Sequence, residues 1–347
     1  MSTQVERRAE PVELGLPGLM ELASGYQRAQ VLFVASELGL FRALATGLRS
    51  AAEIAEALKA PTRGVGALLD ACVAMNLVRR SADGYENSRT AGLFLSGTEM
   101  TFGSALRFWQ RFSYDIWGRL AEAIRQGRPQ SANGTRGQDL FDWLVTDDAR
   151  LRLFFDGLAS LAYWPARKLA TLVDLSRRTH LLDVGGGDGA VSEVLASRYP
   201  HLRVTLFDRE AVCSLARERF DRLGAGDRLV TAPGDFHRDR LPSGPDCVLL
   251  SNVLHDWSPE ECRALLAKVH AVLPPEGEVI VHDFLPPERG RSREACLFEL
   301  ALVLDTERGK VYTADEVRAW LETAGFHQIR EAPVTPATGL LVGVKAG

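Results

Sequence analysis

The residues with the clearest chemical potential form a glycine-rich turn that contains acids. Residues 180–190 read HLLDVGGGDGA, in which Asp183 ends an apolar run and Gly185, Gly187 and Gly189 follow at every second position. Glycine permits positive φ and lets a ligand approach the backbone closely. The spacing is GxGxG and differs from the GxGxxG of dinucleotide-binding turns. A turn of this kind after a buried strand predicts a nucleotide or nucleoside site.

Two carboxylates in this turn, Asp183 and Asp188, narrow the choice of ligand. A dinucleotide places its pyrophosphate on a helix N-terminus, and carboxylates there would repel it. S-adenosylmethionine carries an ammonium and a sulfonium and has no phosphate, so the same acids would attract it. We therefore predict S-adenosylmethionine as the cofactor, held by Gly185, Gly187 and Asp183. The same argument disfavours NAD-dependent redox chemistry.

Residues at the ends of later apolar runs extend the predicted cofactor site. Asp208 ends the run RVTLFD, and a carboxylate at this position can accept hydrogen bonds from both ribose hydroxyls. In the stretch PGDFH, Asp235 can accept from the adenine amino group and Phe236 can stack on the ring. A turn cap at Asp235 and core packing at Phe236 are the structural alternatives, but acids at successive strand ends favour a binding site.

His255 is the candidate general base. It lies in SNVLHDWSPEEC, at the carboxyl end of a predicted strand and therefore beside the cofactor crevice. The next predicted strand ends in VIVHDF, so Asp283 can lie near His255 and fix the tautomer of its imidazole. Because side chains alternate along a strand, only one of His282 and Asp283 can face this site. The pair predicts methyl transfer to a phenolic or similar hydroxyl.

These residues need a parallel sheet to bring them together. From about residue 171 apolar runs alternate with helical segments, which indicates an α/β domain with a Rossmann-like, mostly parallel sheet covered on both faces. Residues 325–347 predict two further strands, as an antiparallel pair at the edge of the sheet. The five parallel strands are predicted at residues 180–184, 203–208, 228–232, 246–252 and 278–284.

The first hundred residues predict helices followed by a hairpin, which is the layout of a winged helix. Ser50 with Glu53 three residues later is typical of a capping box, and Asp83 with Gly84 is typical of a hairpin turn. A winged helix can bind DNA or pack against another subunit. Arg63 is the single cation in the stretch PTRGVGALLDA, so the charge pattern favours packing.

The segment that follows is helical and rich in aromatic residues, and some of its rings can line a pocket for a flat substrate. We therefore predict three parts: residues 1–100 as a winged-helix dimerisation domain, 101–170 as a helical linker with substrate-pocket residues, and 171–347 as the catalytic domain.

Composition limits the partners of the chain. Its 347 residues carry a net charge of −4, whereas a duplex-binding protein shows a basic surplus. No apolar run reaches the roughly 18 residues that a membrane span needs. The N-terminus has no signal-peptide apolar region, and the five cysteines are scattered with no CxxC pair. We therefore expect a cytoplasmic protein with a small-molecule substrate, no nucleic-acid or membrane partner and no metal.

Together the motifs resemble the class I S-adenosylmethionine-dependent small-molecule O-methyltransferases, which include the caffeic acid and acetylserotonin types and natural-product tailoring enzymes. The similarity covers nearly the whole chain, through LLDVGGGDG, LFD, GDF, LHDWSPEEC and AGF. It implies a homodimer through the N-terminal domain and a substrate pocket between the domains. By position it implies cofactor contacts at Gly185, Asp208, Asp235, Phe236 and Ser251, a base at His255 and an orienting acid at Asp283.

The chain departs from this family's plant members at three positions. They often have lysine where this chain has Ser251, and glutamate where it has Asp283. They carry a second orienting glutamate in a GKERT-like stretch, whereas this chain reads GKVYT and has Val311 there.

Two alternatives to O-methylation follow from these departures and from the fold. Relatives with the same dimeric architecture methylate carbon on activated rings or α-keto acids, some of them with a bound metal. In this chain the available metal ligands would be His255, His282, Asp256 and Asp283, although the alternation of side chains along a strand argues against all four converging on one metal ion. The other alternative is a binding protein or winged-helix regulator that keeps only the fold.

Overall fold

The computed structural model describes residues 14–97, 102–130, 140–288, 290 and 292–347. The chain divides into two compact units, Met1–Leu106 and Arg107–Gly347. Within the described residues no helix combines the length and the apolar character needed to cross a membrane.

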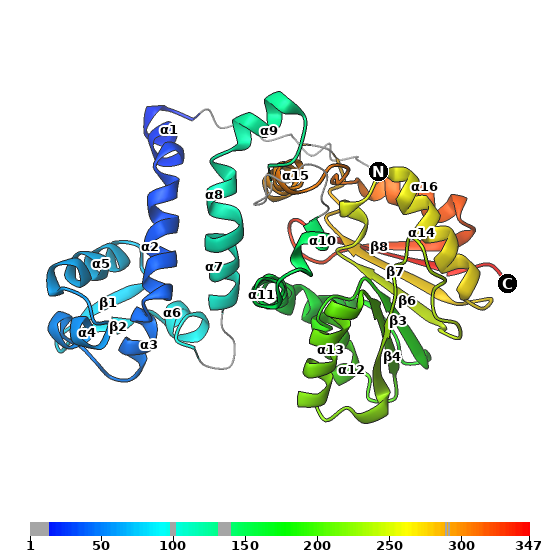
Figure 1. The fold of residues 1–347 in the computed structure, drawn as a ribbon, viewed down its shortest axis with the longest axis horizontal. Helices are drawn as coiled ribbons and strands as arrows, with labels where there is room; N and C mark the ends of the chain where they lie inside the picture. The colour runs from blue at the N-terminus through cyan, green and yellow to red at the C-terminus, as the bar shows by residue number, and fades with distance from the viewer. Residues whose placement is uncertain (1–13, 98–101, 131–139, 289, 291) are drawn as a thin grey trace, which may run out of the picture. The chain divides into compact units, whose positions relative to one another are not determined.

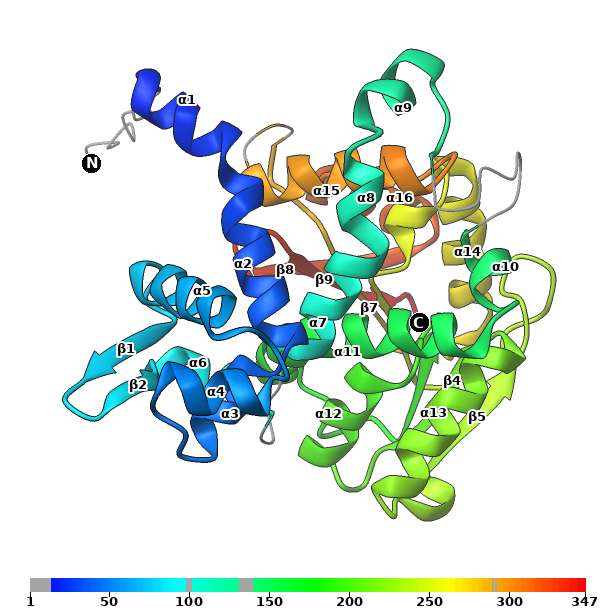
Figure 2. The same cartoon turned by 60° about the vertical axis from the view of Figure 1, so that its left-hand side comes forward.

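The first unit consists of short helices and one hairpin (Figure 2). Its elements are α1 (Leu16–Ala23), α2 (Gly25–Glu37), α3 (Leu40–Ala45), α4 (Ala51–Ala57), α5 (Thr62–Ala74), β1 (Val78–Ser81), β2 (Gly84–Asn87) and α6 (Arg89–Phe94). The capping box of Ser50 and Glu53 is confirmed, since each side chain bonds the other residue's backbone N–H. The predicted hairpin is also confirmed, with Ser81 paired to Gly84 at its turn. The winged-helix assignment itself stays a prediction.

The buried side chains of the first unit come from α2 to α6 and the hairpin, among them Leu40, Phe41, Ile54 and Leu69. Helix α1 contributes no buried side chain to this core. Several of its apolar residues are more than half exposed instead, namely Leu16, Leu19, Met20 and Leu22. An apolar helix without burial in its own unit is a candidate for contact with another surface.

The second unit opens with an aromatic helical segment. Its elements are α7 (Gly103–Phe108), which starts in the first unit, the π-helical turn η1 (Trp109–Ser113), α8 (Tyr114–Trp117), α9 (Leu120–Gln126), α10 (Leu140–Leu144) and α11 (Asp148–Leu172). Phe154 of α11 contacts Phe108 and Phe112 edge-on, with ring centroids 5.5 and 5.7 Å apart. A Cβ added to Gly157 would lie 2.3 Å from the Phe108 Cβ, so α11 needs glycine there to pack this closely.

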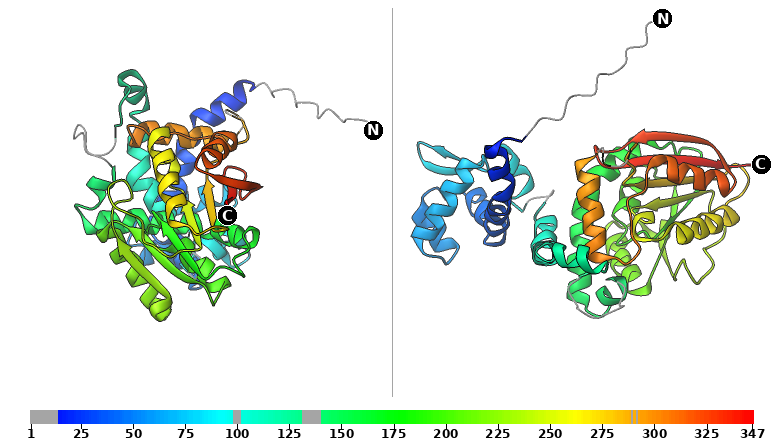
Figure 3. Two further views of the ribbon diagram at one scale, coloured as in Figure 1. Left: turned by 90° about the vertical axis from the view of Figure 1, so that its right-hand side faces the viewer. Right: turned by 90° about the horizontal axis from the view of Figure 1, so that it is seen from above.

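A seven-stranded sheet forms the centre of the second unit (Figure 1). Its order is β5-β4-β3-β6-β7-β9-β8, and β9 runs antiparallel to both of its neighbours. The bounds are β3 (His180–Val184), β4 (Arg203–Asp208), β5 (Leu229–Pro233), β6 (Cys247–Ser251), β7 (Glu278–Asp283), β8 (Phe326–Pro333) and β9 (Gly339–Lys345). The five predicted parallel strands and the antiparallel pair at one edge, red in Figure 3, are confirmed.

Helices cover both faces of this sheet, because successive strand residues point to opposite sides. Leu182 and Val184 of β3 pack with α14 (Pro259–Val272) and α16 (Ala314–Thr323) on one face. Leu181 packs on the other face with α11, α12 (Ala190–Arg198) and α13 (Glu210–Arg222). The remaining helical elements are η2 (Gly226–Arg228), η3 (Leu254–Asp256) and α15 (Arg293–Asp305). The predicted Rossmann-like architecture is confirmed in this unit.

The start of α14 yields a stability prediction, because it follows directly on the short helix that carries His255. Ser258 Oγ accepts from the Glu261 N–H, and a Glu261 carboxylate oxygen accepts from the Ser258 N–H. Ser258→Ala is expected to lower the free energy of unfolding by about 1 kcal/mol, measured by chemical denaturation. Ser258→Asn is the matched control, since asparagine also caps. Equal losses in both variants would contradict the capping role.

Candidate active site

The glycine turn joins β3 to α12 at the carboxyl end of the sheet. Gly187 and Gly189 have φ of 60° and 82°, values that favour glycine. A Cβ on Gly189 would also lie 2.7 Å from a ring carbon of Phe220, so no larger residue fits. The N–H groups of Gly185, Gly187, Gly189 and Ala190 all donate hydrogen bonds within the protein. The path of the turn is therefore fixed by the chain's own contacts.

Asp183 lies behind this turn. Its side chain is buried, and Oδ2 accepts a 2.6 Å hydrogen bond from Ser192 of α12. Burial raises the pKa of Asp183 to about 7. Its second oxygen, Oδ1, has no hydrogen-bond partner among the described residues. The prediction that Asp183 contacts a cofactor stays a prediction, and the geometry gives it a role in supporting the turn.

Asp188 is already paired. The guanidinium of Arg219, on α13, bonds Asp188 Oδ2 and also donates from Nε to the Asp188 carbonyl. Burial raises the pKa of Asp188, while the charge of Arg219 acts in the opposite direction. The expected electrostatic attraction of this acid for a cationic ligand is therefore largely cancelled by a cation that the sequence pattern did not reveal.

Asp208 lies at the carboxyl end of β4, next to the turn. Its Oδ2 accepts from the Gly187 N–H at 2.9 Å and its Oδ1 from the Arg209 N–H at 2.7 Å. Burial raises the pKa of Asp208 to about 6, against these hydrogen bonds, which stabilise the charged form. A carboxylate has about four lone-pair sites, so Asp208 keeps acceptor capacity beyond its two backbone donors.

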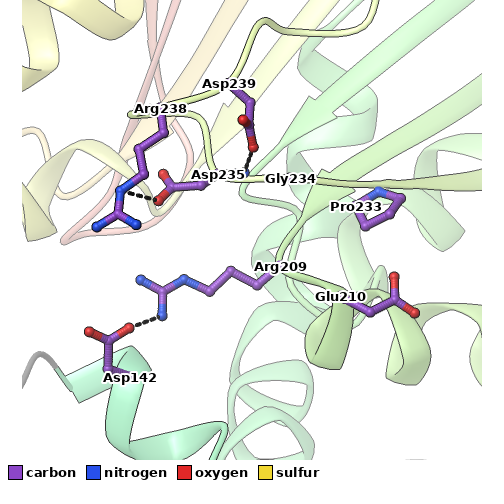
Figure 4. A pocket seen from close by; sticks show the side chains of 8 residues that line it. All are labelled: Asp142, Arg209, Glu210, Pro233, Gly234, Asp235, Arg238 and Asp239. Carbon is purple, nitrogen blue, oxygen red and sulfur yellow. Dashed lines mark hydrogen bonds and ion pairs between the residues drawn. The ribbon is translucent and has the colours of Figure 1, made fainter.

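Asp235 lines an open cleft of about 450 Å³ beyond the ends of β4 and β5 (Figure 4). Its Oδ1 accepts from the His237 N–H, and Oδ2 lies 3.5 Å from Arg238. An ion pair of 2.5 Å joins Arg209 and Asp142 in the same cleft. The cleft is lined by Asp142, Arg209, Glu210, Pro233, Gly234, Asp235, Arg238 and Asp239.

Phe236 brings the loop after β5 to the glycine turn. A Cβ on Gly185 would lie 3.6 Å from a Phe236 ring carbon and 2.9 Å from Val253, which follows β6. The Phe236 ring also contacts Trp257 edge-on at 5.6 Å. The loops after β3, β5 and β6 therefore converge, as the predicted cofactor site requires.

Ser251 ends β6 and bonds a neutral histidine. Its hydroxyl lies 2.9 Å from His282 Nδ1, and His282 Nε2 lies 3.3 Å from the Thr338 hydroxyl. Burial lowers the pKa of His282 to about 4, so this ring is uncharged near neutral pH. His282 thus bonds Ser251 and Thr338, which lies in the connection between β8 and β9. Asp283 is the residue that contacts His255.

His255 and Asp283 form a buried pair. His255 Nδ1 donates to Asp283 Oδ1 at 2.6 Å, and Asp283 also accepts from the Leu254 and Phe284 N–H groups. Parallel pairing of β6 with β7 sets Ser251 opposite His282, which places Asp283 beside the helix that carries His255. Because Nδ1 is engaged, Nε2 is the nitrogen available for chemistry.

The charge state of His255 depends on two acids. Burial would lower the pKa of His255, but Asp283 and Asp256 raise it to about 9. Asp256 lies on the other side of the ring, with Oδ1 3.6 Å from Nε2. Asp305, at the end of α15, adds a partly buried carboxyl whose pKa is raised to about 7 by burial and by Asp256.

Sequence analysis missed the groups around Nε2. The sequence pattern offers Asp256 only as a possible metal ligand, although its position next to His255 in the chain is a usable signal. Phe298 contacts the imidazole edge-on at 4.8 Å and stacks on Phe284 at 3.8 Å, and no local motif marks either ring. Val311 is buried. It lies close to this site, because the N–H of the preceding residue, Lys310, donates to the His255 carbonyl.

The described residues contain no group of three or more His, Cys, Asp or Glu side chains arranged to hold a metal ion. The acceptors at the site instead match a ligand rich in N–H and O–H donors: the carboxylates of Asp208 and Asp235, and the unpartnered Asp183 Oδ1. This set fits the ammonium, ribose hydroxyls and adenine amino group of S-adenosylmethionine.

Known proteins resemble this chain over nearly its whole length. Two family models match the chain, an O-methyltransferase domain over residues 117–327 and an O-methyltransferase dimerisation domain over residues 20–97. A 3-hydroxy-5-methyl-1-naphthoate 3-O-methyltransferase from Streptomyces sahachiroi is 36% identical over 94% of this chain and 95% of its own length. Acetylserotonin O-methyltransferase from Mus musculus is 35% identical over 90% of this chain and 84% of its own.

The solved structure of human N-acetylserotonin methyltransferase in complex with S-adenosylmethionine superposes with a TM-score of 0.89 and 28% identity, covering 98% of this chain and all of the other. The cofactor predicted from the glycine turn is thus the cofactor of the family. The chain belongs to the S-adenosylmethionine-dependent O-methyltransferases and carries that family's dimerisation domain.

Proposed function

We propose that this enzyme methylates an aromatic hydroxyl of a small molecule, with His255 as general base and Asp283 as the acid that orients it. The observation that carries the proposal is the 2.6 Å hydrogen bond from His255 Nδ1 to Asp283. It holds the ring in the tautomer that leaves Nε2 to accept the hydroxyl proton. When bound, S-adenosylmethionine supplies a methyl group on a positively charged sulfur. The hydroxyl oxygen bonds to that carbon as the carbon–sulfur bond breaks.

The pKa of His255 supports its assignment as the base. A free phenol has a pKa near ~10 and a free imidazole near ~6.5, a gap of about 3.5 units. The acids beside His255 raise its pKa to about 9 and close most of this gap. Proton transfer from a bound phenol to unprotonated Nε2 is then less unfavourable than transfer to an ordinary imidazole, although near pH 7 His255 must first lose the proton that its raised pKa retains.

Aromatic surroundings support an aromatic acceptor. The stacked rings of Phe284 and Phe298 lie beside the His255 imidazole. The relative from Streptomyces is named for a hydroxylated naphthoate, which is a flat aromatic acid. A flat ring held against such side chains would present its hydroxyl in a constant orientation, and orientation of this kind can lower the barrier by ~7–11 kcal/mol.

The cofactor site of the proposal comprises the residues that meet at the strand ends. Asp208 accepts hydrogen bonds from the ribose hydroxyls, and Asp235 and Phe236 hold the adenine. The other residues of the cofactor site are Ser251, Asp183, Gly185 and Gly187. Convergence of the loops after β3, β5 and β6 supports this assignment. As domain limits we propose residues 1–100 for dimerisation, 101–170 for linker and substrate contacts, and 171–347 for catalysis.

The remaining partner assignments rest on charge and cysteine use. The net charge of −4 favours a small-molecule acceptor over nucleic acid. Four cysteines (Cys72, Cys213, Cys247 and Cys262) are buried and free, which supports a reducing, cytoplasmic location.

His255→Ala tests the base. We expect kcat to fall about 10²–10⁴-fold while the dissociation constant for S-adenosylmethionine stays within about twofold, because the base acts on the acceptor. Asp208→Asn is the converse variant and should weaken cofactor binding about tenfold or more, because it removes charge-assisted hydrogen bonds. Turnover and isothermal calorimetry measure the two effects. Unchanged turnover in His255→Ala would remove the base from the mechanism.

The pH dependence of the rate has a definite sign. A base must be unprotonated, so kcat/KM for the acceptor should rise about tenfold per pH unit and level off near pH 9, the pKa of His255. A bound sulfonium lowers that pKa, so the inflection at saturating cofactor lies at or below this value. In Asp283→Asn the inflection should move to lower pH, because burial of the His255 ring then lowers its pKa without the opposing charge of Asp283. A flat wild-type profile between pH 6 and 9 would contradict this assignment.

We further propose that the chain forms a homodimer through its N-terminal domain, in which the exposed apolar face of α1 is covered. Leu19→Asp combined with Leu22→Asp should reduce the mass measured by light scattering from that of a dimer to that of a monomer, because charged residues resist burial. Leu223→Asp is the control, since Leu223 is an exposed leucine at the end of α13. A dimer that survives the double change would show that α1 lies outside the interface.

A further inference from the structure

We infer that Arg219 is a positioning residue for the cofactor: its guanidinium neutralises the buried Asp188 carboxylate and thereby lets Asp188 keep its place in the glycine turn. The inference rests on the proposed assignment of residues 185–189 to the cofactor site. Arg219 lies on α13, outside every motif of the sequence, and does not itself belong to the proposed set of cofactor contacts.

The guanidinium satisfies three acceptors on two neighbouring pieces of chain. Nε donates to the Asp188 carbonyl at 3.0 Å, one terminal nitrogen bonds Asp188 Oδ2, and the other bonds Glu193 Oε2 at 2.7 Å. The side chains of Arg219 and Asp188 are 19% and 10% exposed. A planar fork of donors suits this arrangement, whereas the compact ammonium of lysine cannot reach all three acceptors. Arg219 therefore joins the turn to the first turn of α12.

Other contacts at the turn transmit this constraint to the ribose acceptor. Asp188 Oδ1 accepts from the Ala190 N–H, while Phe220, the residue after Arg219, packs on Gly189. On the opposite side, the Gly187 N–H donates to Asp208. The turn is thus held between α13 and Asp208, so a displacement of Asp188 would disturb the carboxylate proposed to bind the ribose.

Loss of Arg219 would leave a buried carboxylate without its cation. An uncompensated buried charge is strongly unfavourable, so Asp188 would take up a proton or turn towards solvent. The charged groups that face Asp188 are Arg219 of α13, Asp156 of α11 and, through Arg219, Glu193 of α12. With Arg219 removed, the other two of these charged groups, Asp156 and Glu193, are both acidic. Protonation at lower pH would then relieve the defect.

The test measures cofactor affinity by calorimetry, at about pH 6 and pH 8. Arg219→Met should weaken S-adenosylmethionine binding about tenfold or more at pH 8 and clearly less at pH 6, while kcat at saturating cofactor stays within about twofold. Adding Asp188→Asn to Arg219→Met removes the unpaired charge and should restore affinity to within about threefold of wild type at both pH values. Arg219→Lys should give a loss of S-adenosylmethionine affinity between those of the wild type and Arg219→Met.

Arg222→Met is the matched control, since Arg222 is exposed one turn further along α13, and its affinity should equal that of the wild type. The inference is overturned if Arg219→Met binds the cofactor as wild type does, or if Asp188→Asn fails to rescue it. Should Arg219→Met not fold, the double variant and Arg219→Lys carry the same comparison. Wild-type affinity in Asp208→Asn would instead refute the cofactor-site assignment, whatever Arg219 does.

Discussion

Buried carboxylates at the carboxyl ends of parallel strands are the constraint on which this site depends. An acid removed from water must find donors or a cation, or else it loses its charge. The site contains both outcomes. Asp283 receives backbone N–H groups and the His255 imidazole, and its pKa is lowered despite burial. Asp183 has one hydroxyl donor and a pKa raised to about 7. The strand ends thus carry acids of the same type with different charge.

This difference explains how one fold supports both binding and proton transfer. Because Asp283 stays charged, it keeps His255 basic and correctly oriented. His282, the preceding residue on β7, points away from that pair and is neutral, so it serves Ser251 without competing for the proton. Because side chains alternate along β7, His282 and Asp283 point to opposite sides of the strand. The pairing of β6 with β7 then places His255 beside Asp283.

The sequence predicted what depends on local pattern, and missed what depends on distant packing. Strand ends, the glycine turn and the pairing of His255 with Asp283 follow from apolar runs and the usual order of a parallel sheet, and all are present. Arg219 lies 31 residues from Asp188 in the chain and reaches it only because α13 packs beside the turn. Phe298 likewise reaches His255 from α15. Helical periodicity does not specify which neighbour a helix face will meet.

S-adenosylmethionine is the cofactor of the family, but the structure indicates a physical basis other than repulsion of phosphate by acids. Repulsion of phosphate by Asp188 is weakened by Arg219, and Asp183 is only partly charged near neutral pH. A pyrophosphate site needs free backbone N–H groups at the turn and the start of the helix. Here Gly187 donates to Asp208 and Ala190 donates to Asp188, so the protein's own acids occupy donors that a phosphate would use. Carboxylates therefore compete with a phosphate for two N–H donors of the turn, which favours a ligand that brings donors of its own.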